Sequence, residues 1–172
     1  MPLKVESFCT LGGINDTAYE GETVKLPLRR KTFWEVKLDA ISLGAAVASD
    51  LGNNIGAILD TGTPLVVMPT NFAELLNRYI GADEVFGGLH EVECSRREEL
   101  PDLTFALSGY DFSISAYDYI LETDAGGCIS CFYGLDTGEK IGPLFILGTP
   151  FLRRWYSIFD LDNDVVSLAR AV

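Results

Sequence analysis

One aspartate in this sequence follows an apolar run, where burying a carboxylate costs free energy. Asp60 follows the apolar run Gly56-Ala57-Ile58-Leu59, and a second apolar run, Leu65-Val66-Val67-Met68, comes after Thr61-Gly62-Thr63-Pro64. Apolar runs bounded by turn residues predict buried strands, and Gly62 allows a sharp turn between them. A carboxylate at the end of a buried strand is costly unless hydrogen bonds hold it, so Asp60 is a candidate for chemistry.

The neighbours of Asp60 suit acid–base chemistry. The hydroxyls of Thr61 and Thr63 and the backbone N–H groups of the turn can hydrogen-bond an ionised carboxylate. Two such carboxylates face to face would share one proton, because like charges that close do not both ionise. One then acts as a base toward water while the protonated one polarises a carbonyl. We expect a single motif of this kind, so a second chain or a missing half must supply the other carboxylate.

The elements that position Asp60 are predicted to be mainly β. Alternating polar and apolar residues predict strands with one wet face at 23–28 and 33–43, and a hairpin at 103–107 and 110–114 turns at Ser108-Gly109. Further strands are expected at 91–94 and 126–133, a short strand or turn-bound edge at 117–121, and a final hairpin at 156–161 and 165–169. We expect residues 1–172 to form a single closed-barrel-like β domain with no internal linker.

One or two short helices are expected within this domain. Residues 71–80 have apolar side chains at helical spacing, with Thr70 or Asn71 as the candidate cap and Gly81 as the stop. Pro150 is suited to opening a second helical turn.

The sequence around Asp60 has an internal echo. Ile58-Leu59-Asp60-Thr61-Gly62-Thr63-Pro64-Leu65 is similar to Ile146-Leu147-Gly148-Thr149-Pro150-Phe151-Leu152. The pattern suggests one strand-and-turn unit used twice, although a match this short also arises by chance.

Composition limits the classes of partner. The 172 residues are 48% hydrophobic, which is enough to bury a core. A formal charge of -12 argues against nucleic acid, since such binders need clustered Lys and Arg. Acidity most often serves solubility, and less often it marks an acidic compartment. No apolar run is long enough to span a bilayer, so no membrane partner is expected.

Cysteine and histidine usage argues against a metal site or a cofactor. The four cysteines are Cys9, Cys94, Cys128 and Cys131, and there is one histidine, His90. A single C-x-x-C and one histidine supply a zinc site poorly, so disulfide bonding is the better interpretation, with three pairings open. A nucleophile activated by a buried histidine is also disfavoured.

One surface modification pattern is present. Asn15-Asp16-Thr17 follows the turn residues Gly12-Gly13 and matches the N-glycosylation acceptor pattern. Such triplets also arise by chance.

Taken in order, several stretches resemble the pepsin-like aspartic proteases, and specifically their C-terminal lobe. The resemblance is carried first by Ala57-Ile58-Leu59-Asp60-Thr61-Gly62-Thr63 followed downstream by Ile146-Leu147-Gly148. Further stretches are similar to fungal vacuolar or secreted members: Leu11-Gly12-Gly13-Ile14, Tyr19-Glu20-Gly21, residues 30–36, Glu99-Leu100-Pro101-Asp102-Leu103 and residues 151–160.

The resemblance implies a role for each matching residue. Asp60 is the catalytic aspartate, on a ψ-shaped loop supported by Ile146, Leu147 and Gly148. Thr61 takes part in a grip between the two lobes, and Gly62 and Thr63 lie at the substrate. Cys94 and Cys128 match a disulfide of this lobe, while Cys9 and Cys131 are left as free thiols or a second bridge.

The resemblance also implies partners and a location. These are a peptide or protein substrate cleaved at acidic pH, an N-terminal lobe or a second copy of this chain, and pepstatin-type inhibitors. The family is secreted or found in the vacuolar or lysosomal lumen. Without a second lobe or self-pairing, the isolated chain is expected to have little or no activity.

Two departures from the family pattern keep an alternative open. Pro64 stands where Ser or Thr is usual, and Thr149-Pro150 replaces a common acidic residue. The alternative is a non-catalytic module that binds a peptide or inhibitor. A phosphoryl-transfer ATPase is disfavoured, because Asp60 lacks the lysine of an Asp-Lys-Thr-Gly-Thr nucleophile and there is no Walker-type loop.

Overall fold

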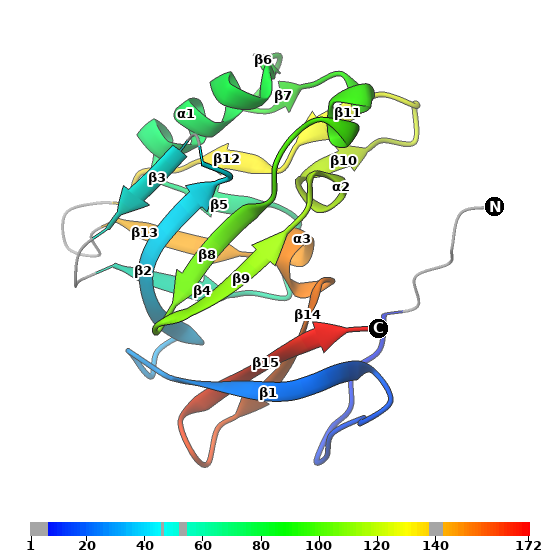
Figure 1. Cartoon of the computed structure of the whole chain (residues 1–172). Helices are drawn as coiled ribbons and strands as arrows, with labels where there is room; N and C mark the ends of the chain where they lie inside the picture. Colours follow the sequence, from blue (N-terminus) through cyan, green and yellow to red (C-terminus); the bar gives the residue numbers. More distant parts are fainter. Residues whose placement is uncertain (1–6, 46, 52–54, 138–142) are drawn as a thin grey trace.

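The largest sheet contains the strands on both sides of Asp60. The computed structural model describes residues 7–45, 47–51, 55–137 and 143–172. The order in this sheet is β12-β5-β13-β4-β2-β8-β9, and β3 pairs with β2 (Figure 1). The strands are β2 (Glu35–Leu43), β3 (Val47–Asp50), β4 (Gly56–Leu59), β5 (Val66–Met68), β8 (Leu103–Leu107), β9 (Tyr110–Ile114), β12 (Phe132–Gly134) and β13 (Leu144–Leu147).

Two smaller sheets complete the β structure. One has the order β1-β15-β14 and lies below the large sheet in Figure 1; its strands are β1 (Tyr19–Pro27), β14 (Trp155–Asp160) and β15 (Val165–Ala171). The other has the order β10-β11-β7-β6, from β6 (Asp83–Glu84), β7 (His90–Glu91), β10 (Ile120–Glu122) and β11 (Cys128–Ser130). The predicted mainly β class is confirmed.

The large sheet is folded over but not closed into a barrel. Strand β2 lies between β4, which pairs with residues 35–37, and β8, which pairs with Leu38–Leu43. The pairing with β8 has a register shift between Leu38 and Ala40. A bulge bends a strand and increases its twist. Among the described strands, the path ends at β12 and β9, which do not pair with each other. The sheet is therefore open, and the expectation of a closed barrel was wrong on that point.

The main helix was predicted correctly except for its cap. Helix α1 spans Thr70–Ile80 and ends at Gly81 in the left-handed conformation (φ 73°). Its N-cap residue is Pro69, whose side chain makes no capping hydrogen bond. The N–H of Thr70 donates instead to Oδ1 of Asp136 at 3.0 Å. Neither Thr70 nor Asn71 is the cap, because an aspartate distant in sequence takes that place.

Three short helical segments join the strands. These are the 3₁₀ helix η1 (Cys94–Glu98), α2 (Ala116–Tyr119) and α3 (Thr149–Leu152). Helix α3 has Pro150 in its first turn, as predicted. Among the described residues, no helix is long and apolar enough to cross a membrane.

Three predicted strands differ in the structure. The strand expected at 91–94 is shorter, because η1 begins at Cys94, and the one at 117–121 begins as α2. The strand at 126–133 divides at Cys131, whose N–H donates to Tyr119 and whose carbonyl accepts from Val66. The chain leaves one sheet and enters another there, which local alternation does not reveal. The two predicted hairpins, β8–β9 and β14–β15, are confirmed.

Aromatic side chains pack α3 into the core beside the site. Phe151 of α3 is fully buried, and its ring centroid lies 5.7 Å from that of Phe105 and 6.4 Å from that of Phe112. Trp155 packs edge-on against Phe112 at 4.9 Å. This packing fixes the chain that follows β13.

Candidate active site

Two strands of similar sequence, β4 and β13, position the Asp60 turn. Strands β4 and β13 are parallel, with Ile58 opposite Ile146 and Leu59 opposite Leu147. Strand β13 also pairs antiparallel with β5, so it lies between the two strands that the Asp60 turn connects. The N–H of Asp60 donates to the carbonyl of Leu147 at 3.1 Å. This is the ψ-shaped arrangement that the resemblance implied, and the two echoing segments lie side by side.

The Asp60 carboxylate is held from within its own turn. Oδ1 accepts the backbone N–H of Gly62 at 2.9 Å, and Oδ2 accepts the hydroxyl of Thr63 at 2.5 Å. Asp60 and Thr63 are half-buried, while Thr61 and Gly62 are exposed. Each oxygen thus has one short-range donor, and the carboxylate is oriented at a half-buried position.

Glycine at position 148 allows the second turn to approach the first. A Cβ at Gly148 would lie 2.0 Å from the carbonyl oxygen of Thr63 and 2.4 Å from that of Leu65, both backbone atoms. From the next residue, the N–H and hydroxyl of Thr149 donate to the Thr63 carbonyl at 2.8 and 3.3 Å. The segment after β13 therefore supports the turn that carries Asp60.

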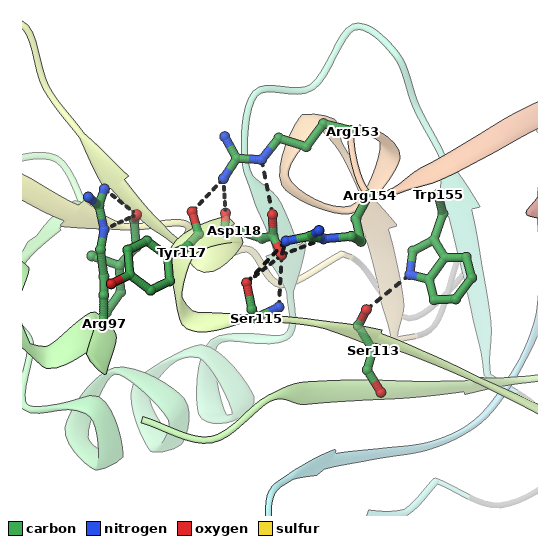
Figure 2. Close-up of polar contacts among 9 residues, drawn as sticks. Arg97, Ser113, Ser115, Tyr117, Asp118, Arg153, Arg154 and Trp155 are labelled. Carbon is green, nitrogen blue, oxygen red and sulfur yellow. Dashed lines mark hydrogen bonds and ion pairs between the residues drawn. The ribbon is translucent and has the colours of Figure 1, made fainter. Parts of the chain in front are cut away.

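A buried carboxylate anchors the far end of α3 (Figure 2). Asp118 of α2 is 5% exposed and accepts from Arg154 Nε at 3.0 Å and Nη2 at 2.9 Å, and Arg153 Nε lies 3.4 Å from its other oxygen. The side chain also accepts the N–H and hydroxyl of Ser115, both at 2.8 Å. Arg153 Nη2 donates to the carbonyls of Tyr117 and Asp118 at 2.7 and 3.0 Å.

Sequence reasoning missed this anchor, although half of it was visible. Ser115-Ala116-Tyr117-Asp118 has the capping-box spacing of a helix start. The pairing of Asp118 with Arg153 and Arg154 has no local signal, because 35 and 36 residues separate the partners along the chain.

The expectation of a single Asp-Thr-Gly motif was wrong, because Asp136-Thr137-Gly138 is a second triplet. Gly138 lies outside the described residues. The exposed Asp136 caps α1 through Thr70, whose N–H and side chain hold the pKa of Asp136 below its ordinary value. Asp60 precedes β5 and Thr70 follows it, so the structure places the two aspartates at opposite ends of that strand. Asp136 does not pair with Asp60.

Thr61 faces a groove rather than the carboxylate. The groove has a volume of about 730 Å³ and is lined by Thr61, residues 8–14, Leu152 and the run from Tyr156 to Asp162. Exposed apolar side chains on this surface include Phe8, Leu11 and Ile14. A concave surface with exposed apolar groups thus lies beside the Asp60 turn.

The cysteines follow the pairing that the resemblance implied. Cys94 and Cys128 form a disulfide with a Cα–Cα distance of 5.3 Å. Cys9 is an exposed free thiol and Cys131 a buried one, so the second bridge is not formed. Burial raises the pKa of the Cys131 thiol, which keeps it protonated.

A family model and individual known proteins both match nearly the whole chain. Residues 3–171 match the model of a family described as eukaryotic aspartyl protease. Vacuolar protease A of Aspergillus fumigatus is 52% identical over 165 residues, covering 96% of this chain and 41% of that protein. A vacuolar aspartic protease of Candida albicans is 44% identical over 160 residues, with 93% and 38% covered. Dog cathepsin D is 36% identical over 164 residues, with 94% and 40% covered. The chain thus spans about two fifths of the length of these relatives.

Proposed function

This chain belongs to the family of eukaryotic aspartyl proteases, and on that premise we propose that Asp60 supplies one of the two carboxylates of an aspartic endopeptidase site. Residues 1–172 would form one catalytic lobe. The observation that carries the proposal is the oriented carboxylate: Gly62 and Thr63 each hold one oxygen of the half-buried Asp60.

The chemistry needs two carboxylates that share a proton. The ionised one takes a proton from a water molecule, which attacks the carbonyl carbon of the peptide bond. The protonated one donates a hydrogen bond to the carbonyl oxygen and stabilises the charge that develops there. The two donors to Asp60 fix its oxygens in advance, so no reorganisation is needed when the water is deprotonated.

The second carboxylate is proposed to come from an N-terminal lobe or a second copy of this chain. Asp136 does not serve, because it is exposed and engaged at the start of α1. The groove beside Thr61 is the proposed contact surface for that lobe, with Thr61 in the grip between lobes. By itself the chain is expected to show little or no turnover.

The substrate proposed is a peptide or protein, bound with its scissile bond over Asp60 and contacting Gly62 and Thr63. Pepstatin-type inhibitors are proposed to occupy the same place. Relatives named vacuolar protease and cathepsin support a vacuolar or lysosomal lumen, or secretion. The net charge of -12 is compatible with an acidic lumen, where carboxylates lose charge.

A chimaera tests the role of Asp60. The matching two fifths of the Aspergillus vacuolar protease A would be replaced by this chain, and cleavage of an unfolded protein measured at acidic pH with and without pepstatin. We expect pepstatin-sensitive turnover that falls at least about 10³-fold with Asp60→Asn, as for loss of a group acting in the transition state.

Asp136→Asn is the matched control, since it alters the other Asp-Thr-Gly triplet and should leave turnover unchanged. Turnover that survives Asp60→Asn would refute the assignment of Asp60. A folded chimaera that binds pepstatin without cutting would instead favour a peptide- or inhibitor-binding module, the alternative that Pro64 raises.

A further inference from the structure

The turn at Asn15 is an ordered unit outside the protease site. Oδ1 of Asn15 accepts the backbone N–H of Thr17 at 3.1 Å and the hydroxyl of Thr17 at 2.8 Å. The N–H of Ala18 donates to the Asn15 carbonyl at 3.1 Å, which closes a β-turn. Among the described residues, no hydrogen bond engages Nδ2 of Asn15. The amide oxygen is therefore occupied and the amide nitrogen is available.

This turn is fixed to the β1-β15-β14 sheet. The N–H of Asn15 donates to the phenol oxygen of Tyr156 at 3.2 Å, and the Tyr156 ring stacks on Tyr19 with centroids 5.2 Å apart. The hydroxyl of Tyr19 donates to Oδ1 of Asp16 at 3.1 Å. Asp16 and Thr17 remain exposed. The result is a defined surface turn in which Asn15 is half-buried and the two residues after it are exposed.

We propose that Asn15 carries an N-linked oligosaccharide. Asn15-Asp16-Thr17 is the only Asn-x-Ser/Thr triplet in the 172 residues, and x is not proline. In the structure, the Thr17 hydroxyl that the pattern requires contacts the Asn15 amide directly. The pattern and the geometry thus agree at one residue. The proposal rests on the luminal location proposed above, because the sugar donor and its transferase act in the secretory pathway.

The sugar donor for this transfer is an oligosaccharide linked through pyrophosphate to a polyisoprenoid lipid. The Nδ2 nitrogen of Asn15 attacks C1 of the first N-acetylglucosamine, and an N–C bond forms. The bond between C1 and the pyrophosphate oxygen breaks, and the lipid pyrophosphate leaves with its electron pair. One proton of the amide is lost to a base of the transferase. Nothing is oxidised or reduced.

The site lies at the edge of the groove. Ile14 lines the groove at Thr61, and Asn15 is the next residue, turned onto Tyr156 by its own N–H. A glycan at Asn15 would stand at the edge of this surface, where it adds bulk and solubility.

The test expresses the whole chain in yeast behind a secretory leader. A band of higher apparent mass that endoglycosidase H collapses, together with a sugar-modified peptide containing Asn15, is the expected result. Asn15→Gln and Thr17→Ala should each abolish the shift. Thr17→Ser keeps the hydroxyl and should retain it, which separates glycan attachment from a structural effect of altering the turn.

The readouts distinguish this site from the proposed function. Formation of the Cys94–Cys128 disulfide reports that the chain reached an oxidising lumen and folded. A disulfide-bonded chain without the shift overturns the glycosylation proposal, whereas failure of the Asp60 chimaera leaves it intact. A shift that persists in Asn15→Gln would also overturn it, since another residue would carry the sugar.

Discussion

Asp60 and Asp136 each precede a Thr-Gly pair, and each carboxylate accepts a backbone N–H, yet the donors come from different places. Asp60 accepts from Gly62, inside its own turn, whereas Asp136 accepts from Thr70, 66 residues away. A carboxylate bonded within its turn is oriented and remains open to another molecule. A carboxylate that accepts the N–H at the start of a helix is already engaged as the cap of that helix.

The segments before the two aspartates explain the difference. All four residues of β4 are buried, and β13 and β2 flank that strand, so Asp60 leaves the core at a defined point. Asp136 follows the exposed Leu135, just beyond the short edge strand β12. The same three-residue pattern therefore has two outcomes, and the buried strand is what distinguishes the candidate catalytic turn.

The largest expected effect comes from adding a side chain at Gly148, where the backbone lies close to the Asp60 turn. Gly148→Ala places a Cβ against two backbone carbonyls, which cannot rotate away. We expect a loss of more than about 3 kcal/mol in the free energy of unfolding, or no folded chain. Gly127→Ala is the control, because its Cβ would meet only Thr123 Oγ1 at 3.8 Å. Similar urea midpoints for the two variants would mean that the turns do not approach as described.

A smaller effect is expected at the anchor of α3. Asp118→Ala leaves the guanidinium of Arg154 partly buried without its ion pair and removes the α2 cap. We expect a loss of about 3 kcal/mol in the free energy of unfolding and faster hydrogen exchange at Gly62 and Thr63, with exchange at Thr70 unchanged.

Glu99→Ala is the control for Asp118, because Glu99 is an exposed partner of Arg96 at 3.4 Å. That variant should lose less than about 0.5 kcal/mol. If exchange at Thr70 rises as much as at Gly62, the anchor does not act selectively on the Asp60 turn.

Removing one donor to Asp60 tests its internal support. Thr63→Val keeps the side-chain shape but deletes the hydroxyl bonded to Oδ2. A loss of about 1 kcal/mol is expected in unfolding at neutral pH. Thr61→Val, at an exposed neighbouring position, should lose less. Equal losses in the two variants would indicate that the Thr63 hydrogen bond does not contribute.

The smallest effect is a pH dependence at the second triplet. The hydrogen bonds from Thr70 lower the folded-state pKa of Asp136 below its ordinary 3.8, so this contribution to stability is present above that value. It is lost as the pH falls through the lower folded pKa. Asp136→Asn should therefore reduce the fall in melting temperature between about pH 5 and pH 2. An unchanged pH dependence in the variant would rule out the cap.

Much of the local structure followed from the sequence alone. Apolar runs predicted β4 and β5, turn residues predicted both hairpins, and helical spacing with Gly81 predicted the extent of α1. These features depend on neighbours a few residues apart, which is the range over which alternation and turn preferences act. The two segments of the echo at Ile58 and Ile146 are paired parallel strands, but β4 leads into the Asp60 turn whereas β13 leads into helix α3.

Tertiary structure decided how those pieces are used. It placed the second Asp-Thr-Gly at the start of α1, paired Asp118 with arginines 35 and 36 residues away, and folded the sheet at β2 without closing it. Each of these depends on groups far apart in the sequence, which meet only when the core packs. The sequence by itself determined that Asp60 ends a buried strand, and packing against Leu147 and Gly148 made it the open, oriented carboxylate.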